Sequence, residues 1–178
     1  MKRKLWFLAG VVALASSQSV LAETLDVDMY RVSKDGIGEP VGHVQITETR
    51  YGLEFTPDLK GLKPGPHGFH IHAKGNCEVM AEGDKIIPAG AAGGHFDPEN
   101  TGQHEGPYGE GHLGDLPSLL ATDSGEVNYP VLAPRIHKLS EIKGLALMLH
   151  AGGDNYSDEP AKLGGGGSRV ACGVIGGQ

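Results

Sequence analysis

The chain has no excess of basic residues, no more than one pair of cysteines and no apolar segment long enough to cross a membrane. Its 178 residues contain 15 Lys and Arg against 22 Asp and Glu, and the formal net charge is −7 at pH 7. A net negative charge argues against nucleic acid or an anionic membrane as a partner. Two cysteines are too few for a disulfide-rich scaffold, so a hydrophobic core must supply most of the stability.

The longest apolar run covers residues 5–15 and follows three basic residues at positions 2–4. At about 1.5 Å per residue it is too short for the roughly 30 Å of hydrocarbon in a bilayer. A basic start, a short apolar run and small residues ending at Ala22 are typical of a secretory signal peptide. We expect residues 1–22 to be removed, leaving residues 23–178 as one exported domain with a net charge of −10 and no membrane anchor.

The two cysteines, Cys77 and Cys172, form an even pair in a protein expected to be exported. An oxidising compartment favours a disulfide between them, and two free thiols are the alternative. In the chain-entropy model, a bridge that closes a loop of about 95 residues stabilises the fold by about 4 to 5 kcal/mol, less any strain in the bridge.

Short segments of alternating apolar and polar residues recur along the chain, separated by turn residues, and each is typical of a half-buried β-strand. They are residues 25–29, 41–47, 53–55, 68–72, 127–132, 145–149 and 170–175. The best helical candidate, residues 138–143, is at most a turn or two long. The pattern predicts an all-β sandwich or barrel.

Two long segments, residues 73–120 and 151–168, separate these strands and are rich in Gly, Pro and Asp. Loops of this length are usually either functional or disordered. The histidines of the first segment favour a function. The second contains four consecutive glycines at 164–167, which taken alone are also compatible with a flexible linker.

The first candidate for metal binding is the pair His70 and His72, in the segment Gly-Phe-His-Ile-His. Side chains two positions apart on a strand project from the same face about 7 Å apart, so both imidazoles can reach one ion. Two hydrogen-bonded histidines on a polar strand face are the alternative. His150, after the apolar strand 145–149, fits an ordinary core position or, with the other two, a nitrogen-rich site suited to copper.

The first long segment carries a second candidate set, His95, His104, His112 and Asp115. Three histidines and one carboxylate make a closed four-ligand set of the kind that zinc takes in structural sites. Scattered surface histidines are the alternative. A zinc ion would also explain how so long a loop becomes ordered.

Five motifs resemble the copper,zinc superoxide dismutases, and they follow one another in the order found in that family. They are Gly-Phe-His-Ile-His at 68–72, Gly-Gly-His-Phe-Asp-Pro at 93–98, Gly-His-Leu-Gly-Asp-Leu-Pro at 111–117, His-Ala-Gly-Gly-Asp-Asn at 150–155 and Gly-Ser-Arg-Val-Ala-Cys-Gly-Val-Ile at 167–175. The resemblance covers essentially the whole chain after the signal. The long zinc loop and the Gly-Gly-Asp-Asn resemble the bacterial, periplasmic branch, which implies the periplasm as location.

This resemblance implies a Greek-key β-sandwich, or flattened barrel, of about eight antiparallel strands with two long functional loops. It also implies one copper and one zinc per chain. The implied copper ligands are His70, His72, His95 and His150, and the implied zinc ligands are His95, His104, His112 and Asp115. His95 would then bridge the metals as an imidazolate that uses both ring nitrogens.

The resemblance also assigns roles outside the ligand sets. Asp154 matches a carboxylate that hydrogen-bonds one copper and one zinc histidine and holds their ring orientation. Arg169 matches the arginine beside the copper, and His95 would act as a general acid toward the departing peroxide. The two cysteines would tie the metal loop to the strand of Arg169.

The remaining histidines and one acid are not expected to bind metal. His67 matches a family position that braces the backbone, and His43 and His137 lie outside every ligand motif. Asp97 is expected to be a turn residue.

The implied activity is disproportionation of superoxide to dioxygen and hydrogen peroxide, with the electrons carried by copper because zinc has no redox chemistry. The substrate is an anion and the chain is acidic, so local positive charge must attract it. Arg169 is the best candidate, and Lys74 and Lys162 are weaker ones, chosen for their nearness in sequence to the metal loops.

Two other functions fit the residues less well. A metal carrier would need neither Arg169 nor a bridging ligand at His95. A zinc hydrolase would need a carboxylate placed with His70 and His72 as a water-activating base, and the sequence offers no obvious one.

The oligomeric state stays open between a monomer and a homodimer. Dimeric bacterial relatives tend to carry a tryptophan in the zinc loop, but the only tryptophan here is Trp6, in the signal. Tyr108 lies in that region instead, which puts a dimer of this type in doubt.

Overall fold

The computed structural model describes residues 22–177. The expected signal peptide therefore lies outside the described residues, apart from Ala22 at its end. Within residues 22–177, no helix is long and apolar enough to cross a membrane.

The described chain consists of β-strands, three short 3-10 helices and long loops. The strands are β1 (Thr24–Ser33), β2 (Gly36–Thr49), β3 (Gly52–Leu59), β4 (Gly65–His67), β5 (Phe69–His72), β6 (Met80–Glu82), β7 (Lys85–Ile87), β8 (Leu119–Ala121), β9 (Val131–Ala133), β10 (Ala146–His150) and β11 (Arg169–Val174). The 3-10 helices are η1 (Gly90–Ala92), η2 (Leu139–Glu141) and η3 (Leu163–Gly165).

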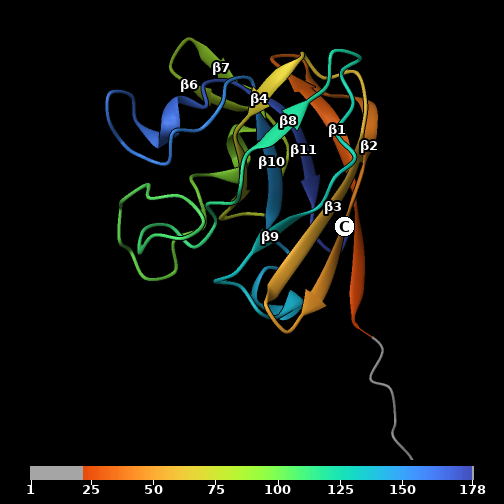
Figure 1. The fold of residues 1–178 in the computed structure, drawn as a ribbon. Coiled ribbons are helices and arrows are strands. Elements are labelled where there is room, and N and C mark those ends of the chain that lie inside the picture. The colour runs from red at the N-terminus through yellow and green to blue at the C-terminus, as the bar shows by residue number, and fades with distance from the viewer. Residues whose placement is uncertain (1–21, 178) are drawn as a thin grey trace, which may run out of the picture.

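Seven strands form one antiparallel sheet in the order β5-β10-β11-β1-β2-β3-β9. The sheet curls into a flattened barrel, and the two long loops project from one side of it (Figure 1). Strands far apart in sequence are neighbours, since β11 pairs with β1 and β10 pairs with β5. The predicted all-β Greek-key architecture is confirmed.

Most of the expected strands lie within observed ones, but the strand expected at residues 127–132 is only partly right. β9 starts at Val131, and Val127 makes an isolated bridge to Leu59. Pro130 has no amide hydrogen to donate to a ladder, which explains why the pairing is interrupted before β9. The β6–β7 hairpin is absent from the prediction because its strands are three residues each and mostly exposed.

The alternation along β5 positions the candidate site. Phe69 and Ile71 are fully buried in the main core, where Phe69 packs edge-to-face on Phe55 with ring centroids 5.7 Å apart. Burying side chains of this size stabilises by about 1.5 to 3 kcal/mol each. His70 and His72 point to the opposite face of the strand, beneath the loop that follows it. One strand therefore both fills the barrel and carries two candidate ligands.

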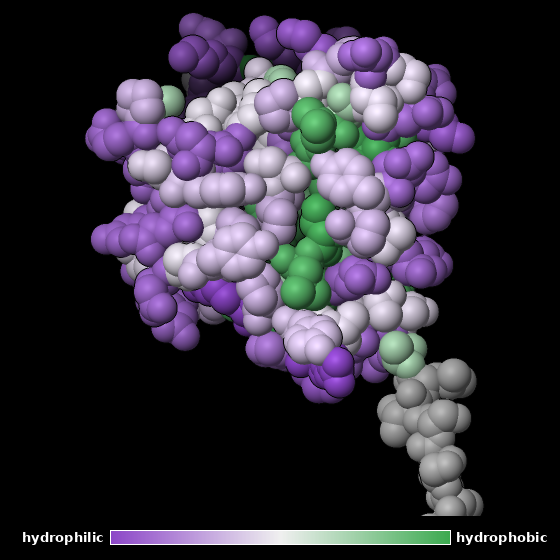
Figure 2. All heavy atoms as spheres, viewed as in Figure 1, coloured by the Kyte–Doolittle hydropathy of each residue, from purple (hydrophilic) through white to green (hydrophobic). Residues whose placement is uncertain are grey.

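The view in Figure 2 shows a mostly hydrophilic surface with apolar atoms confined to a narrow strip down its middle, in the region of β8, β3 and β9. Leu120 of β8 is one exposed apolar side chain, at 58%.

Candidate metal centre

The edge of β5 pairs with two segments of the long loop instead of another strand. The amide of Phe96 donates to the carbonyl of Ile71, and the amide of Ile71 donates to the carbonyl of Gly114, both at 2.8 Å. A Cβ at position 114 would come within 2.3 Å of the Ile71 oxygen, so this approach requires glycine.

This pairing explains how ligands distant in sequence meet. His72 and His95 are bridge partners, and so are His70 and Asp115. His150 joins them from β10, which pairs with β5 on its other edge. Pairing of β5 with the long loop on one edge and with β10 on the other therefore brings these expected ligands together, which their spacing in the sequence could not show.

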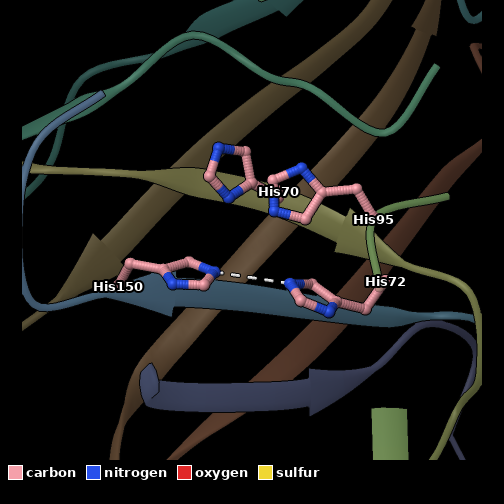
Figure 3. A group of neighbouring side chains, drawn as sticks. All are labelled: His70, His72, His95 and His150. Carbon is pink, nitrogen blue, oxygen red and sulfur yellow. Dashed lines mark hydrogen bonds between the residues drawn. The ribbon is translucent and has the colours of Figure 1, made fainter. Parts of the chain in front are cut away.

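Two groups of buried residues have ligand atoms that all lie within 4.8 Å of one another. The first is His70, His72, His95 and His150, and the second is His70, His95, His104 and Asp115. Figure 3 shows the four histidines of the first group, with His70 and His95 close together and His72 facing His150. The rings of His70 and His95 stack with centroids 4.0 Å apart.

In the first group, backbone carbonyl oxygens lie within hydrogen-bond distance of one ring nitrogen of His72 and of His150. The Nδ1 of His72 lies 2.8 Å from the carbonyl oxygen of Gly93, and the Nδ1 of His150 lies 3.1 Å from that of Gly167. Each Nδ1–H can donate to its carbonyl, which leaves the Nε2 lone pair for a metal. The two Nε2 atoms face each other at 3.3 Å.

Asp154 connects the two groups. Its Oδ2 lies 2.7 Å from the Nε2 of His70 and its Oδ1 lies 2.7 Å from the Nε2 of His104. Both histidines are left with Nδ1 for a metal. The geometry is the one expected of a carboxylate that orients ligands of two ions.

Asp115 is the centre of the second group. Its Oδ1 lies 2.8 Å from the Nδ1 of His95, and its Oδ2 lies 2.8 Å from the Nδ1 of His104. His112 lies slightly farther out, with Nδ1 3.5 Å from Oδ1, and falls outside the tight group that instead includes His70.

The donor atoms fit metals better than they fit hydrogen bonds. Within the described chain, six buried side-chain N and O atoms have no hydrogen-bond partner, and five of them belong to the expected ligands. These five are His70 Nδ1, His95 Nε2, His104 Nδ1, His112 Nδ1 and Asp115 Oδ2. Leaving a buried polar atom unpaired costs about 1 to 3 kcal/mol, and binding of cations by these five atoms would remove that cost. The residues therefore fit two metal ions.

Burial favours the neutral form of His72, His95 and His150 in the first group. Desolvation lowers the pKa of His95 to about 4 despite the opposing hydrogen bond to Asp115, and it lowers the pKa of His150 to about 3. The pKa of His72 is also well below its usual value, chiefly because of burial. Neutral imidazoles are the form that binds a metal, so His72 and His150 need release no proton at neutral pH, whereas His95 would lose its remaining ring proton to bind two ions.

In the second group, the two neighbouring carboxylates oppose the effect of burial on the pKa of His104. Burial lowers the pKa of His104, but the adjacent carboxylates of Asp115 and Asp154 outweigh this and raise it to about 9. Their contacts with the histidine rings hold the pKa values of both carboxyls well below their usual range, against the effect of burial. Metal binding at His104 must therefore displace a proton.

Arg169 lies next to His150, its register partner across β10 and β11. Its guanidinium donates to the carbonyls of Ala89 at 2.6 Å and Gly93 at 2.5 Å. Gly93 also accepts from His72, so one carbonyl connects the arginine to an expected ligand.

A pocket of about 740 Å³ opens beside Arg169 and is lined by Lys34 and Lys85 as well as Asp84. The expected lysines, Lys74 and Lys162, are exposed but do not line it. Sequence reasoning missed Lys34, which lies between β1 and β2, and Lys85, which lies on the β6–β7 hairpin within the first long segment but away from its histidines.

The predicted disulfide between Cys77 and Cys172 is present, with Cα atoms 5.8 Å apart. It lies in a small second core with Ala89 and Ala92. The bridge attaches the start of the long loop to β11, the strand that begins with Arg169.

The other residues lie as expected. His67 is buried with its nitrogens 2.6 and 2.7 Å from the carbonyl oxygens of His150 and Lys63, so it braces the backbone. His43 and His137 are exposed and belong to neither group. The carboxylate of Asp97 accepts hydrogen bonds from the backbone amides of Thr101 and Gly102, in its own turn.

Comparison with known proteins agrees with this geometry. The family described as "Copper/zinc superoxide dismutase (SODC)" matches residues 41–175. The chain is 54% identical over 169 residues to the protein named "Superoxide dismutase [Cu-Zn]" of Escherichia coli, covering 95% of this chain and 98% of that one.

Two solved structures are similar in fold and sequence. A copper/zinc superoxide dismutase from Brucella abortus superimposes with a TM-score of 0.85 at 52% identity, covering 86% of this chain and 99% of that one. The monomeric copper,zinc superoxide dismutase from Salmonella enterica has a TM-score of 0.79 at 55% identity, with the same coverage.

Proposed function

The chain belongs to the copper/zinc superoxide dismutase family, and from this premise we propose how its residues divide the work. It is an oxidoreductase with copper and zinc as cofactors, and it converts two superoxide ions and two protons to dioxygen and hydrogen peroxide. The proposed copper ligands are His70, His72, His95 and His150. The proposed zinc ligands are His95, His104, His112 and Asp115.

The sharing of His95 by both ligand groups is the observation that carries this division. Its Nδ1 faces Asp115 on the zinc side, and its Nε2 is buried without a hydrogen-bond partner. His70 also belongs to both groups, but Asp154 occupies its Nε2. A single free nitrogen can serve one metal, so His70 is assigned to copper and the fourth zinc position to His112.

Copper supplies the one-electron redox chemistry when bound, and zinc has none. Arg169 supplies positive charge for the anion beside the copper ligands, and two carbonyls hold its guanidinium in place. Lys34 and Lys85 extend that charge along the pocket, so they raise the local concentration of superoxide against the negative charge of the whole chain. Because the Nε2 of His95 can bind either copper or a proton, His95 would act as a general acid toward the departing peroxide when that nitrogen carries the proton.

Metal content and activity test the proposal together. Purified protein should bind one copper and one zinc per chain and remove superoxide in a cyanide-sensitive manner. His95→Ala should lose activity and bind both ions less tightly. Full activity with one zinc and no copper would contradict the assignment.

We also propose that the protein is exported to the periplasm, where it removes superoxide from the cell envelope. The signal-like pattern of residues 1–22 supports export, and the disulfide supports an oxidising compartment. N-terminal sequencing of the protein recovered from the periplasmic fraction should begin at Glu23. A start at Met1 would contradict cleavage after Ala22.

A monomer is the proposed assembly. The Salmonella relative is described as monomeric, and the apolar strip on the face of Figure 2 is narrow. Light scattering coupled to size-exclusion chromatography should give about the mass of one processed chain. Twice that mass would establish a dimer.

A further inference from the structure

Two charged side chains from outside the long loop hold the main chain of two proposed zinc ligands. The Oδ2 of Asp158 accepts the amide hydrogen of His104 at 2.9 Å. The guanidinium of Arg135 donates to the carbonyl of His112 at 3.2 Å and to that of Gly111 at 2.8 Å. Neither side chain belongs to a ligand group.

Asp158 is itself fixed by its own loop. Its second oxygen, Oδ1, accepts the amide hydrogen of Leu163 at 3.0 Å, so each carboxylate oxygen has a donor from a different loop. Asp154, four residues earlier, holds the ring of His104 at Nε2. One loop therefore grips His104 at both its ring and its main chain.

The region around His104 leaves little freedom for another arrangement. A Cβ at Gly106 would come within 2.6 Å of the ring of Tyr156, and a Cβ at Gly164 would come within 2.9 Å of the Nε2 of His104. The two loops are thus in close contact at Tyr156 and at Gly164, which precede and follow Asp158 in the sequence.

Arg135 follows β9 and reaches the loop from the barrel. Its planar fork suits two successive carbonyls, whereas an ammonium group would reach one. The backbone amide of His112 donates a hydrogen bond to the carbonyl of Gln103 at 2.8 Å, which joins the segment of His112 to the segment of His104. The hydrogen bond between His112 and Gln103 closes the segment from Gln103 to His112 into a loop. Asp158 holds this loop at His104, and Arg135 holds it at Gly111 and His112.

We propose that Asp158 and Arg135 are positioning residues of the zinc site, which hold the main chain of His104 and His112 where their Nδ1 atoms converge with Asp115. The inference rests on the zinc ligand set proposed above. Groups that act through a ligand commonly change metal affinity by about 10- to 100-fold. The sign of each charge matches the peptide group that it meets, since the carboxylate accepts from N–H and the guanidinium donates to C=O.

The test uses the full protein loaded with copper and zinc, in the variants Asp158→Asn, Arg135→Gln and Arg135→Lys. Zinc release to a chromophoric chelator should be about 10- to 100-fold faster in the first two. Arg135→Lys should lie between Arg135→Gln and the parent, because the ammonium restores one bond of the fork. Asp123→Asn and Arg50→Gln remove exposed charges elsewhere and should match the parent.

Two further readouts separate positioning from general stability. With Co(II) in the zinc site, the visible spectrum of the variants should change, because the ligands are displaced. Copper retention and the unfolding midpoint of the metal-free protein should stay at the parent values. Equal loss of copper and zinc, with a lowered metal-free midpoint, would instead show a merely structural role and overturn the proposal.

The variant His104→Ala distinguishes failure of this inference from failure of the ligand set. If His104→Ala keeps zinc, the proposed ligands are wrong. If it loses zinc while Asp158→Asn and Arg135→Gln release zinc at the parent rate with an unchanged Co(II) spectrum, only the positioning inference fails.

Discussion

The copper half and the zinc half of the centre are built on different kinds of backbone. The copper half is the set of proposed copper ligands His70, His72 and His150, all on strands of the sheet. The zinc half is the set of proposed zinc ligands His104, His112 and Asp115, all on the long loop between β7 and β8. Continuous backbone ladders hold the first set, whereas the second set is held by an isolated bridge at Asp115, a few loop hydrogen bonds and the side chains of Asp158 and Arg135.

The two halves also differ in charge. The pKa of His150 is lowered to about 3 by burial, while that of His104 is raised to about 9 by its two carboxylates despite burial. His72 and His150 therefore offer neutral nitrogens, whereas His104 must lose a proton to bind an ion. From this difference we expect the fold to place the copper ligands in advance and zinc binding to complete the order of the loop.

Among these variants, loss of the Asp115 carboxylate should change zinc binding and the order of the loop the most. We expect Asp115→Ala to weaken zinc binding by more than about 100-fold, because a ligand is lost and not only its support. The loop between residues 98 and 112 should then become sensitive to limited proteolysis. Tight binding of one zinc per chain would refute the assignment.

The matched variant is His150→Ala in the copper half. It should lose copper while retaining zinc and the protease resistance of the loop, because its strand stays paired with β5 and β11. Cleavage of the loop in this variant, as in Asp115→Ala, would remove the distinction between the halves.

Asp154→Asn should affect both halves to an intermediate degree. Its carboxylate joins His70 to His104, and an amide cannot accept from both rings. We expect losses of about 10- to 100-fold in affinity for copper and for zinc, measured by competition with chelators. A loss confined to one metal would show that Asp154 belongs to one half only.

Arg169→Ala should reduce the rate while leaving both metals bound. One removed charge should cost about 10-fold in the rate at low ionic strength and flatten its salt dependence. Pulse radiolysis over a range of salt concentrations measures both. Kinetics identical to the parent at low salt would contradict the role of Arg169, and Lys34→Gln should show a smaller change of the same kind.

The smallest effect is expected for an ion pair of the barrel, away from both halves. Glu48 accepts from the ammonium of Lys138 at 2.9 Å and from the amide of Leu139 at 2.8 Å, and these bonds lower its pKa. A lowered pKa contributes stability above the ordinary value of 4.5 that is lost as the pH falls through the folded value. Metal-free Glu48→Gln should unfold slightly more easily at neutral pH and match the parent at low pH, by thermal denaturation. A constant difference at all pH values would exclude this linkage.

The sequence predicted the copper half more completely than the loop that surrounds it. Alternation along β5 indicated that His70 and His72 share a face, and a period-2 pattern depends only on local backbone geometry. The contacts of Asp158 and Arg135 were not predictable, because each lies more than 20 residues from the backbone atom that it holds. The β6–β7 hairpin and Lys34 beside the pocket were missed for the same reason, since long-range packing places them.

The central claim is that His95 joins the two halves, with one ring nitrogen on each metal. It is tested most directly by electron paramagnetic resonance of protein with Cu(II) in the copper half and Co(II) in the zinc half. A bridging imidazolate predicts magnetic coupling, so the ordinary Cu(II) signal should disappear as the zinc half fills with Co(II). An unchanged Cu(II) spectrum with both sites filled would contradict the bridge.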